Sequence, residues 1–179
     1  MEPGIVIVSG PPAAGKSTLA RALAESVETP LSAHMHSDDV YGYIVKGFVE
    51  PWLPASQHQN TVVIEALAAS AVRFVRGGYL VVMDGVIGPW FLGPWRAAAA
   101  DVPVDYAILF PSPAANLARF AARTDHPLQE EAVVPQMWAA FDAHRAGYER
   151  HILDTSGQTE AESLEALRAG LAEGRFRLA

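Results

Sequence analysis

The stretch Gly4–Ala20, "GIVIVSGPPAAGKSTLA", decides the fold. Its apolar first part, Gly4–Ser9, is typical of a strand buried on both faces. Its last part opens a segment in which Leu19, Leu23 and Val27 recur at helical spacing. Between them, residues 10–17 match the pattern G-x-x-x-x-G-K-[ST], in the strand-to-helix context that this motif requires. The sequence therefore predicts a phosphate-binding loop.

The small side chains of this loop let backbone N–H groups surround a polyphosphate, and the following helix adds its N-terminal amides and partial positive charge. We expect Lys16 to reach the β- and γ-phosphates of ATP, Ser17 to bind Mg²⁺, and Thr18 to add a hydroxyl. The predicted nucleotide-binding set is Gly10, Pro11, Pro12, Ala13, Ala14, Gly15, Lys16, Ser17 and Thr18.

Short β-rich runs alternate with helical patterns along the whole chain, as in a parallel sheet covered by helices. Helix ends are indicated by Ser112 before a proline and by the capping-box spacing of Thr159 and Glu162. The predicted strands are Gly4–Ser9, Leu31–His36, Tyr79–Met83, Val104–Phe110 and His151–Leu153. We therefore predict a three-layer α/β/α fold with a five-stranded parallel sheet, in one domain spanning residues 1–179.

Composition narrows the classes of function. The chain of 179 residues is 50% hydrophobic, carries a net charge of −7 and has no cysteine. Disulfides and thiolate metal sites are thereby excluded, and the acidic balance argues against a nucleic-acid partner. The apolar N-terminal run is too short to span a bilayer and lacks the basic region of a signal peptide, so we expect a cytoplasmic protein without a membrane partner.

The motif and the order of elements resemble the small P-loop kinases of the shikimate, gluconate and adenylylsulfate kinase type. In length and layout the chain is most similar to the chloramphenicol phosphotransferases. The resemblance implies a P-loop NTPase fold with a short helical lid, here near residues 119–135. It also implies transfer of the γ-phosphoryl group of MgATP to a hydroxyl of a small molecule, such as an antibiotic or another partly apolar metabolite.

Two acids follow the second predicted strand, in the segment Ser37–Asp39. The carboxyl ends of parallel strands line the ligand crevice of such folds, and in the resembled kinases an acid at this point orients the acceptor hydroxyl. We favour Asp38 for this catalytic role and place Asp39 beside the acceptor, although the two could be exchanged. The structural alternative is that Ser37 or Asp39 caps a helix beginning near Val40.

Asp84 ends the third predicted strand in the manner of a Walker-B acid, which holds Mg²⁺ directly or through water. The alternative is an Asp-Gly turn that closes the strand. His34 and His36 share one face of the second strand. No third ligand with suitable spacing is visible, so we expect packing or polar contacts there, and not a transition-metal site.

Aromatic residues cluster after the second and third strands and could line an apolar acceptor pocket. The alternative is that they are core residues under irregular loops. The predicted pocket members are Tyr41, Tyr43, Trp52, Trp90 and Phe91, with Phe48 and Trp95 as further candidates.

Arg119 and Arg123 are spaced to share one face of a helix after the fourth strand. The resemblance implies that they clamp the β- and γ-phosphates from the lid, whereas the structural alternative is a solvated helix face. Asp154 and Thr155, with Ser156, match the loop that backs the adenine ring in the resembled kinases, or form a turn leading to the cap at Thr159.

Two other functions stay open. One is a kinase acting on a nucleoside, a nucleotide or a nucleic-acid 5′-hydroxyl, because Ser37–Asp39 also resembles a segment of polynucleotide kinase. The other is a regulatory module that binds a nucleotide without transferring its phosphoryl group.

Overall fold

The computed structural model describes residues 1–98, 100–122 and 132–178, and its five strands form one parallel sheet in the order β2-β3-β1-β4-β5. The strands are β1 (Gly4–Ser9), β2 (Ser32–His36), β3 (Leu80–Asp84), β4 (Val104–Leu109) and β5 (Ile152–Leu153). The predicted α/β fold with five parallel strands is confirmed, and each predicted strand differs from the observed one by at most one residue at either end.

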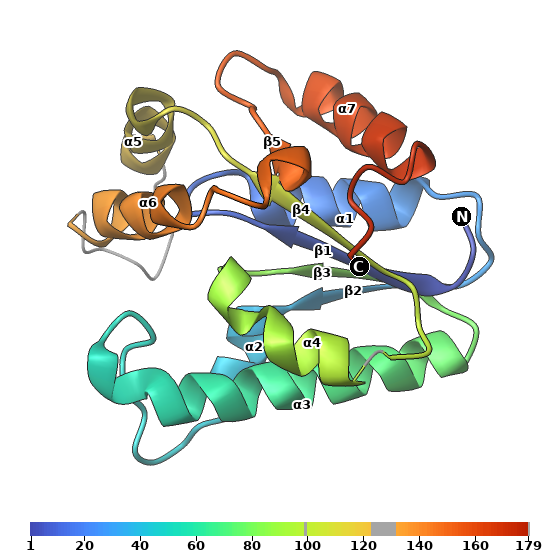
Figure 1. The fold of residues 1–179 in the computed structure, drawn as a ribbon, viewed down its shortest axis with the longest axis horizontal. Coiled ribbons are helices and arrows are strands. Elements are labelled where there is room, and N and C mark those ends of the chain that lie inside the picture. The colour runs from blue at the N-terminus through green and yellow to red at the C-terminus, as the bar shows by residue number, and fades with distance from the viewer. Residues whose placement is uncertain (99, 123–131, 179) are drawn as a thin grey trace.

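Helices pack on both faces of the sheet (Figure 1). The helices are α1 (Lys16–Ser26), α2 (Ser37–Tyr41), α3 (Gln57–Arg76), α4 (Leu92–Ala98), α5 (Pro113–Ala121), α6 (Val133–Ala143) and α7 (Glu160–Ala172). The described residues also form short 3₁₀ turns before α3, α4 and β5, which are η1 (Pro54–Ser56), η2 (Pro89–Phe91) and η3 (Glu149–His151).

Alternate residues of β1 supply two separate hydrophobic cores, because successive side chains of a strand point to opposite faces. Ile5 and Ile7 pack in the core that contains α3 and α4, and Val6 and Val8 pack in the core that contains α1 and α7. Figure 1 shows these two helix pairs on opposite sides of the sheet, while α2, α5 and α6 lie toward one end of it. The carboxyl ends of β1, β2 and β3 lie at this same end of the sheet.

Helix starts follow the sequence signals in two cases and depart from them in one. Ser112 accepts from the N–H of Ala115, and Thr159 and Glu162 form the predicted capping box. The structural alternative, in which Ser37 or Asp39 caps this helix, is not what the structure has. This helix begins directly after β2 and earlier than Val40, so the preceding residue, His36, is the cap, and its Nδ1 accepts from the N–H of Asp38 at 3.0 Å.

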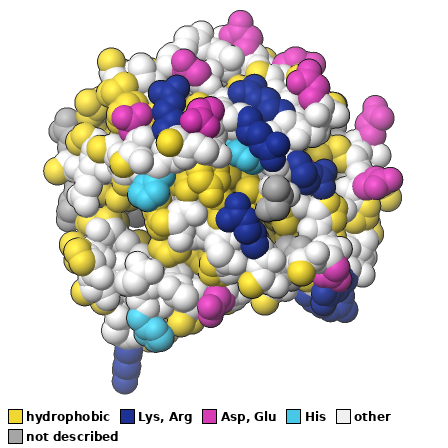
Figure 2. Space-filling model, in the orientation of Figure 1, with side chains coloured by type: hydrophobic (Ala, Val, Ile, Leu, Met, Phe, Trp, Pro, Cys, Tyr) yellow, Lys and Arg dark blue, Asp and Glu magenta, His cyan; other side chains and the backbone are white. Residues whose placement is uncertain are grey.

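Arginines gather on the face that carries the C-terminal segment, where Figure 2 shows several Lys and Arg side chains. Arg175 donates to the carbonyl oxygens of Arg150 and Ile152, and Arg177 pairs with Asp105 at 3.1 Å. These contacts fasten the C-terminal segment to the edge of the sheet, so this basic surface has a structural role.

The predicted lid is described in part. Its helical ends belong to α5 and α6, and residues 123–131, with the predicted phosphate ligand Arg123, lie outside the described residues. Among the helices that are described, none combines the length and the apolar character needed to cross a bilayer.

Candidate active site

The predicted phosphate-binding loop has a backbone that only small residues can follow. Gly10 has a φ of 142°, and a Cβ there would lie 2.2 Å from the carbonyl oxygen of Leu109. Gly15, at the start of α1, has a φ of 92°, and Ala13 adopts a φ of 64°, which is uncommon for a residue with a side chain. The backbone therefore makes a tight turn at the end of β1, and this turn leaves no room for a side chain at Gly10.

Two buried side chains hold this loop from below. The Lys16 ammonium donates to the carbonyl oxygen of Pro11 at 2.8 Å, and the amide of Asn116, from α5, donates to the carbonyl oxygen of Pro12 at 3.0 Å. Sequence reasoning missed Asn116, which lies in the helix that the Ser112 cap predicted. These two hydrogen bonds hold the loop at both of its prolines.

Asp84 is fully buried at the end of β3 and accepts hydrogen bonds from two elements. Its Oδ2 lies 2.6 Å from the Ser17 hydroxyl, and its Oδ1 lies 2.6 Å from Nε2 of His34. His36 is 3.6 Å away, because it pairs with Asp84 in the register of β2 and β3. Burial by itself would raise the pKa of Asp84, but the bonds from His34 and Ser17 and the nearby His36 hold it below its usual value. The carboxylate is therefore ionised beside the loop serine.

Both histidines thus make the polar contacts that we expected at this strand end. Among the residues that the structure describes, no group of three or more histidine, aspartate or glutamate side chains could hold a metal ion.

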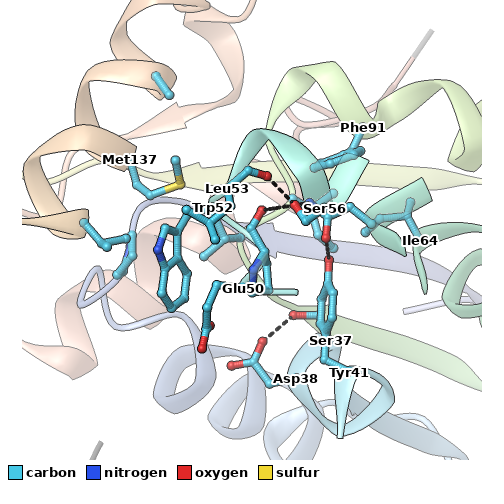
Figure 3. Close-up of a pocket in the computed structure, with 18 of the residues that line it drawn as sticks. Ser37, Asp38, Tyr41, Glu50, Trp52, Leu53, Ser56, Ile64, Phe91 and Met137 are labelled. Carbon is cyan, nitrogen blue, oxygen red and sulfur yellow. Dashed lines mark hydrogen bonds between the residues drawn. The ribbon is translucent and has the colours of Figure 1, made fainter. Parts of the chain in front are cut away.

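A cavity of about 820 Å³ opens beside the phosphate-binding loop. Lys16 and Ser17 line one end of it, and Asp38 lies in its wall. Figure 3 shows that the wall is assembled from α2, the segment before α3, η2 and α6. The predicted aromatic members Tyr41, Trp52, Trp90 and Phe91, and the further candidate Phe48, all line it.

Three other predicted pocket residues are not in the lining of this cavity. Asp39 and Tyr43 are exposed, Tyr43 with 76% of its surface, and Trp95 is fully buried in the core with α3. Asp38 and Tyr41 are three residues apart in α2 and therefore lie on the same face of this helix. Asp39 lies on a different face. The structure therefore does not bring Asp39, Tyr43 and Trp95 into the wall of this cavity.

A buried hydrogen-bond network ties this cavity wall together. Asn60, only 5% exposed, accepts from the Tyr41 hydroxyl at 3.0 Å and donates to the carbonyl oxygen of Pro51 at 2.8 Å and to Ser56 at 2.9 Å. Sequence reasoning missed Asn60. The sequence does contain a signal for it. Asn60 lies three residues before Val63 and so continues the buried apolar stripe of α3 with a polar residue.

Tyr41 stays neutral in this setting. Burial, and to a lesser degree the neighbouring Asp38 carboxylate, raise the pKa of the phenol to about 12. At neutral pH the hydroxyl is therefore a stable donor to Asn60 and connects the helix that carries Asp38 to α3.

A second cavity, of about 210 Å³, lies on the other side of the loop, and its lining includes Thr18, Arg119 and Thr155. Arg119 donates to the Thr155 hydroxyl at 3.1 Å and to the carbonyl oxygen of Ala14 at 3.4 Å. Arg119 is therefore not in the wall of the large cavity. Asp154 lines neither cavity, and its carboxylate accepts from the backbone N–H of Ser156 at 2.9 Å.

Comparison with known proteins gives matches to a family and to solved structures. The AAA domain family (AAA_33) matches residues 5–148, and no curated protein gives a significant match. A sugar kinase from Janibacter sp. HTCC2649 has a similar structure, with 18% sequence identity, a TM-score of 0.73 and 94% coverage of each chain. A gluconokinase from Sinorhizobium meliloti 1021 gives 17% identity and a TM-score of 0.66, covering 96% of this chain and 93% of the other.

The tunicamycin resistance protein of Deinococcus radiodurans is also similar in structure, at 17% identity and a TM-score of 0.64, with 94% of this chain and 96% of the other covered. At these identities the likeness is one of fold, and it agrees with the fold that the loop motif and the order of elements predicted. The chain belongs to the AAA domain family and has the fold of the small P-loop kinases.

Proposed function

We propose that the protein is a kinase that transfers the γ-phosphoryl group of MgATP to a hydroxyl of a small, partly apolar molecule. The observation that carries this proposal is the continuity of one cavity from Lys16 and Ser17 of the loop to Asp38 and the aromatic wall. A direct transfer needs the phosphoryl group and the acceptor in one space, in line and shielded from water.

Asp38 is the residue that we assign to the acceptor hydroxyl. It stands in the cavity wall directly after the end of β2, and it accepts from the Ser37 hydroxyl at 3.1 Å, which fixes the orientation of its carboxylate. A carboxylate so placed accepts the hydroxyl proton as the oxygen attacks phosphorus. The other product is ADP, whose terminal phosphate takes the electrons of the broken bond.

The residues fit a magnesium ion. Ser17 and Asp84 present a hydroxyl and an ionised carboxylate within 2.6 Å of each other, and hard oxygen ligands are those that Mg²⁺ prefers. When bound with ATP, the ion neutralises charge on the phosphate oxygens. His34 keeps the Asp84 carboxylate oriented toward the loop.

We place the nucleoside of ATP in the second cavity. Its lining includes Ala14 and Gly15 of the loop and Thr18 directly after it, so this cavity continues from the phosphate site. Arg119 holds Thr155 against Ala14, and we assign both residues to this side. The phosphate clamp that the family resemblance implied for Arg119 requires the guanidinium to leave these partners, and it stays a prediction.

Acceptor-stimulated release of ADP tests the proposal. Purified protein with MgATP is incubated with hydroxyl-bearing molecules that include antibiotics, nucleosides, sugars and shikimate. We expect one chemical class to raise ADP release well above the water-only rate, and Lys16→Ala to remove both ATP binding and this stimulation. Tight nucleotide binding without stimulation by any class would favour a regulatory module.

A further inference from the structure

Glu50 lines the large cavity but has no part in the phosphoryl transfer described above. Within the described part of the chain, no side chain forms a hydrogen bond or ion pair with its carboxylate. Figure 3 shows this carboxylate projecting into the cavity next to the indole ring of Trp52, toward the same region as Asp38. The side chain is thus available to a molecule bound there.

The backbone on both sides of Glu50 is hydrogen-bonded to η1 and to the first turn of α3. The Gln59 amide accepts from the N–H of Val49 at 2.9 Å and donates to its carbonyl oxygen at 2.7 Å. On the other side, the carbonyl oxygen of Pro51 accepts from Asn60 at 2.8 Å and from Ser56 at 2.9 Å. Glu50 itself is exposed, and these bonds give the backbone that carries it a fixed position at the cavity, as a ligand-binding side chain requires.

The surroundings of this carboxylate are mainly apolar. Trp52, Leu53 and Met137 line the same part of the cavity (Figure 3). A molecule that filled this space would remove water from Glu50, and burying an ionised carboxylate is costly unless a partner compensates its charge. A cationic group supplies that partner, and the indole face of Trp52 offers it a second attraction.

We propose that Glu50 binds a positively charged group, such as an ammonium, on an acceptor whose apolar body packs against Trp52 and whose hydroxyl reaches Asp38. This assignment rests on the acceptor-binding role of the cavity. It makes the substrate class an amphipathic amino alcohol, and makes Glu50 a specificity-determining residue.

Binding without ATP tests this proposal separately from catalysis. The probes are aryl-substituted aminopropanediols and their N-acetyl derivatives, which keep the ring and the hydroxyls and lose only the charge. Quenching of tryptophan fluorescence reports occupancy, because Trp52 and Trp90 line the cavity. We expect an amine to bind about tenfold more tightly than its N-acetyl derivative. This is the ratio of dissociation constants that corresponds to one partly exposed hydrogen bond between charged groups.

Glu50→Gln should abolish this preference while leaving the binding of the N-acetyl probes unchanged. Asp39→Asn is the matched control, because it also removes one carboxylate charge, from a residue of α2 that is not in the cavity lining. Equal binding of amine and N-acetyl probes to the unmodified protein, a preference that survives Glu50→Gln, or a failure of every amine to bind would each overturn the proposal.

The two proposals fail in different ways. Selective amine binding through Glu50 without any phosphorylated product would refute the kinase and leave the ammonium site standing. Phosphorylation of neutral and amine acceptors at equal efficiency, unaffected by Glu50→Gln, would refute the ammonium site and leave the kinase standing.

Discussion

The hydroxyl of Ser17 donates a 2.6 Å hydrogen bond to the buried carboxylate of Asp84, which joins the phosphate-binding loop to the end of β3. Asp84 ends β3, and Ser17 lies in the first turn of α1, after the loop that leaves β1. The two residues meet because β1 and β3 are adjacent in the sheet. This contact brings a hydroxyl and an ionised carboxylate together at the place where the loop would receive the phosphates of ATP.

Replacing Asp84 with asparagine should weaken the use of magnesium. Asp84→Asn removes the anionic group that we propose as a Mg²⁺ ligand while keeping the shape of the side chain, so we expect the apparent affinity for Mg²⁺ in ATP-dependent turnover to fall by about 10- to 100-fold. A Mg²⁺ titration of ADP release measures this. Asp101→Asn, which removes an exposed carboxylate paired with Arg76, is the control and should leave the titration unchanged. An unaltered titration in Asp84→Asn would remove Asp84 from the magnesium site.

Asp38 and Asp39 form a matched pair of acids, one inside the cavity and one outside it. We expect Asp38→Asn to keep ATP binding but to lower kcat by at least about 100-fold, since a positioned proton acceptor contributes that much. Asp39→Asn should keep kcat within about twofold. Steady-state kinetics with a responsive acceptor, together with ATP titration, separate the two effects. Comparable losses in both variants would argue against a specific role for Asp38.

The Tyr41 phenol should make stability depend on alkaline pH. Its folded pKa of about 12 lies above the ordinary value of 10.0, so its contribution is fully present below about pH 10 and is lost as the pH rises toward 12. Tyr41→Phe removes this dependence and costs about 1 kcal/mol at neutral pH through the lost bond to Asn60. Urea unfolding of both proteins at several pH values measures the difference. Parallel pH profiles would show that the phenol ionises normally.

Gly85 packs directly against the helix that carries Asp38. A Cβ at this position would lie 2.3 Å from the Ser37 hydroxyl oxygen, so Gly85→Ala should displace α2 and destabilise the fold by about 1–3 kcal/mol. Turnover should fall further than ATP binding. Gly93→Ala is the comparison, because a Cβ at Gly93 in α4 meets nothing within 4 Å, and it should be neutral or slightly stabilising. If the two variants unfold at the same urea concentration, the packing of Gly85 against Ser37 is not tight in solution.

The phosphate-binding loop could be predicted from the sequence because its chemistry is local. The motif spans only eight residues, in which the positive φ angles of Gly10 and Gly15 require glycine and Lys16 follows at a fixed spacing. The strand before it and the helix after it have clear hydrophobic patterns. The strands and the capping box at Thr159 were predictable for the same reason. Each depends on neighbours in the sequence.

The cavity wall could not be predicted in full from the sequence. It depends on the residue at which each helix begins, which decides the side chains that face inward, and on the pairing of strands that are distant in the sequence. Tyr41 and Tyr43 are alike in sequence, and only the start of α2 at Ser37 turns Tyr41 inward and leaves Tyr43 exposed. Likewise, the contact of His34 with Asp84 follows from the pairing of β2 with β3. Glu50 takes its place through hydrogen bonds from α3, which no local pattern near Glu50 indicates.

The mass of the acceptor after incubation with MgATP tests the central claim most directly. For at least one hydroxyl-bearing small molecule, the unmodified protein should yield a product that has gained one phosphoryl group, in an amount equal to the ADP released. Asp38→Asn should give little of this product, and Asp39→Asn should give the normal amount. ADP release without any phosphorylated acceptor, or a full yield from Asp38→Asn, would contradict transfer within this cavity.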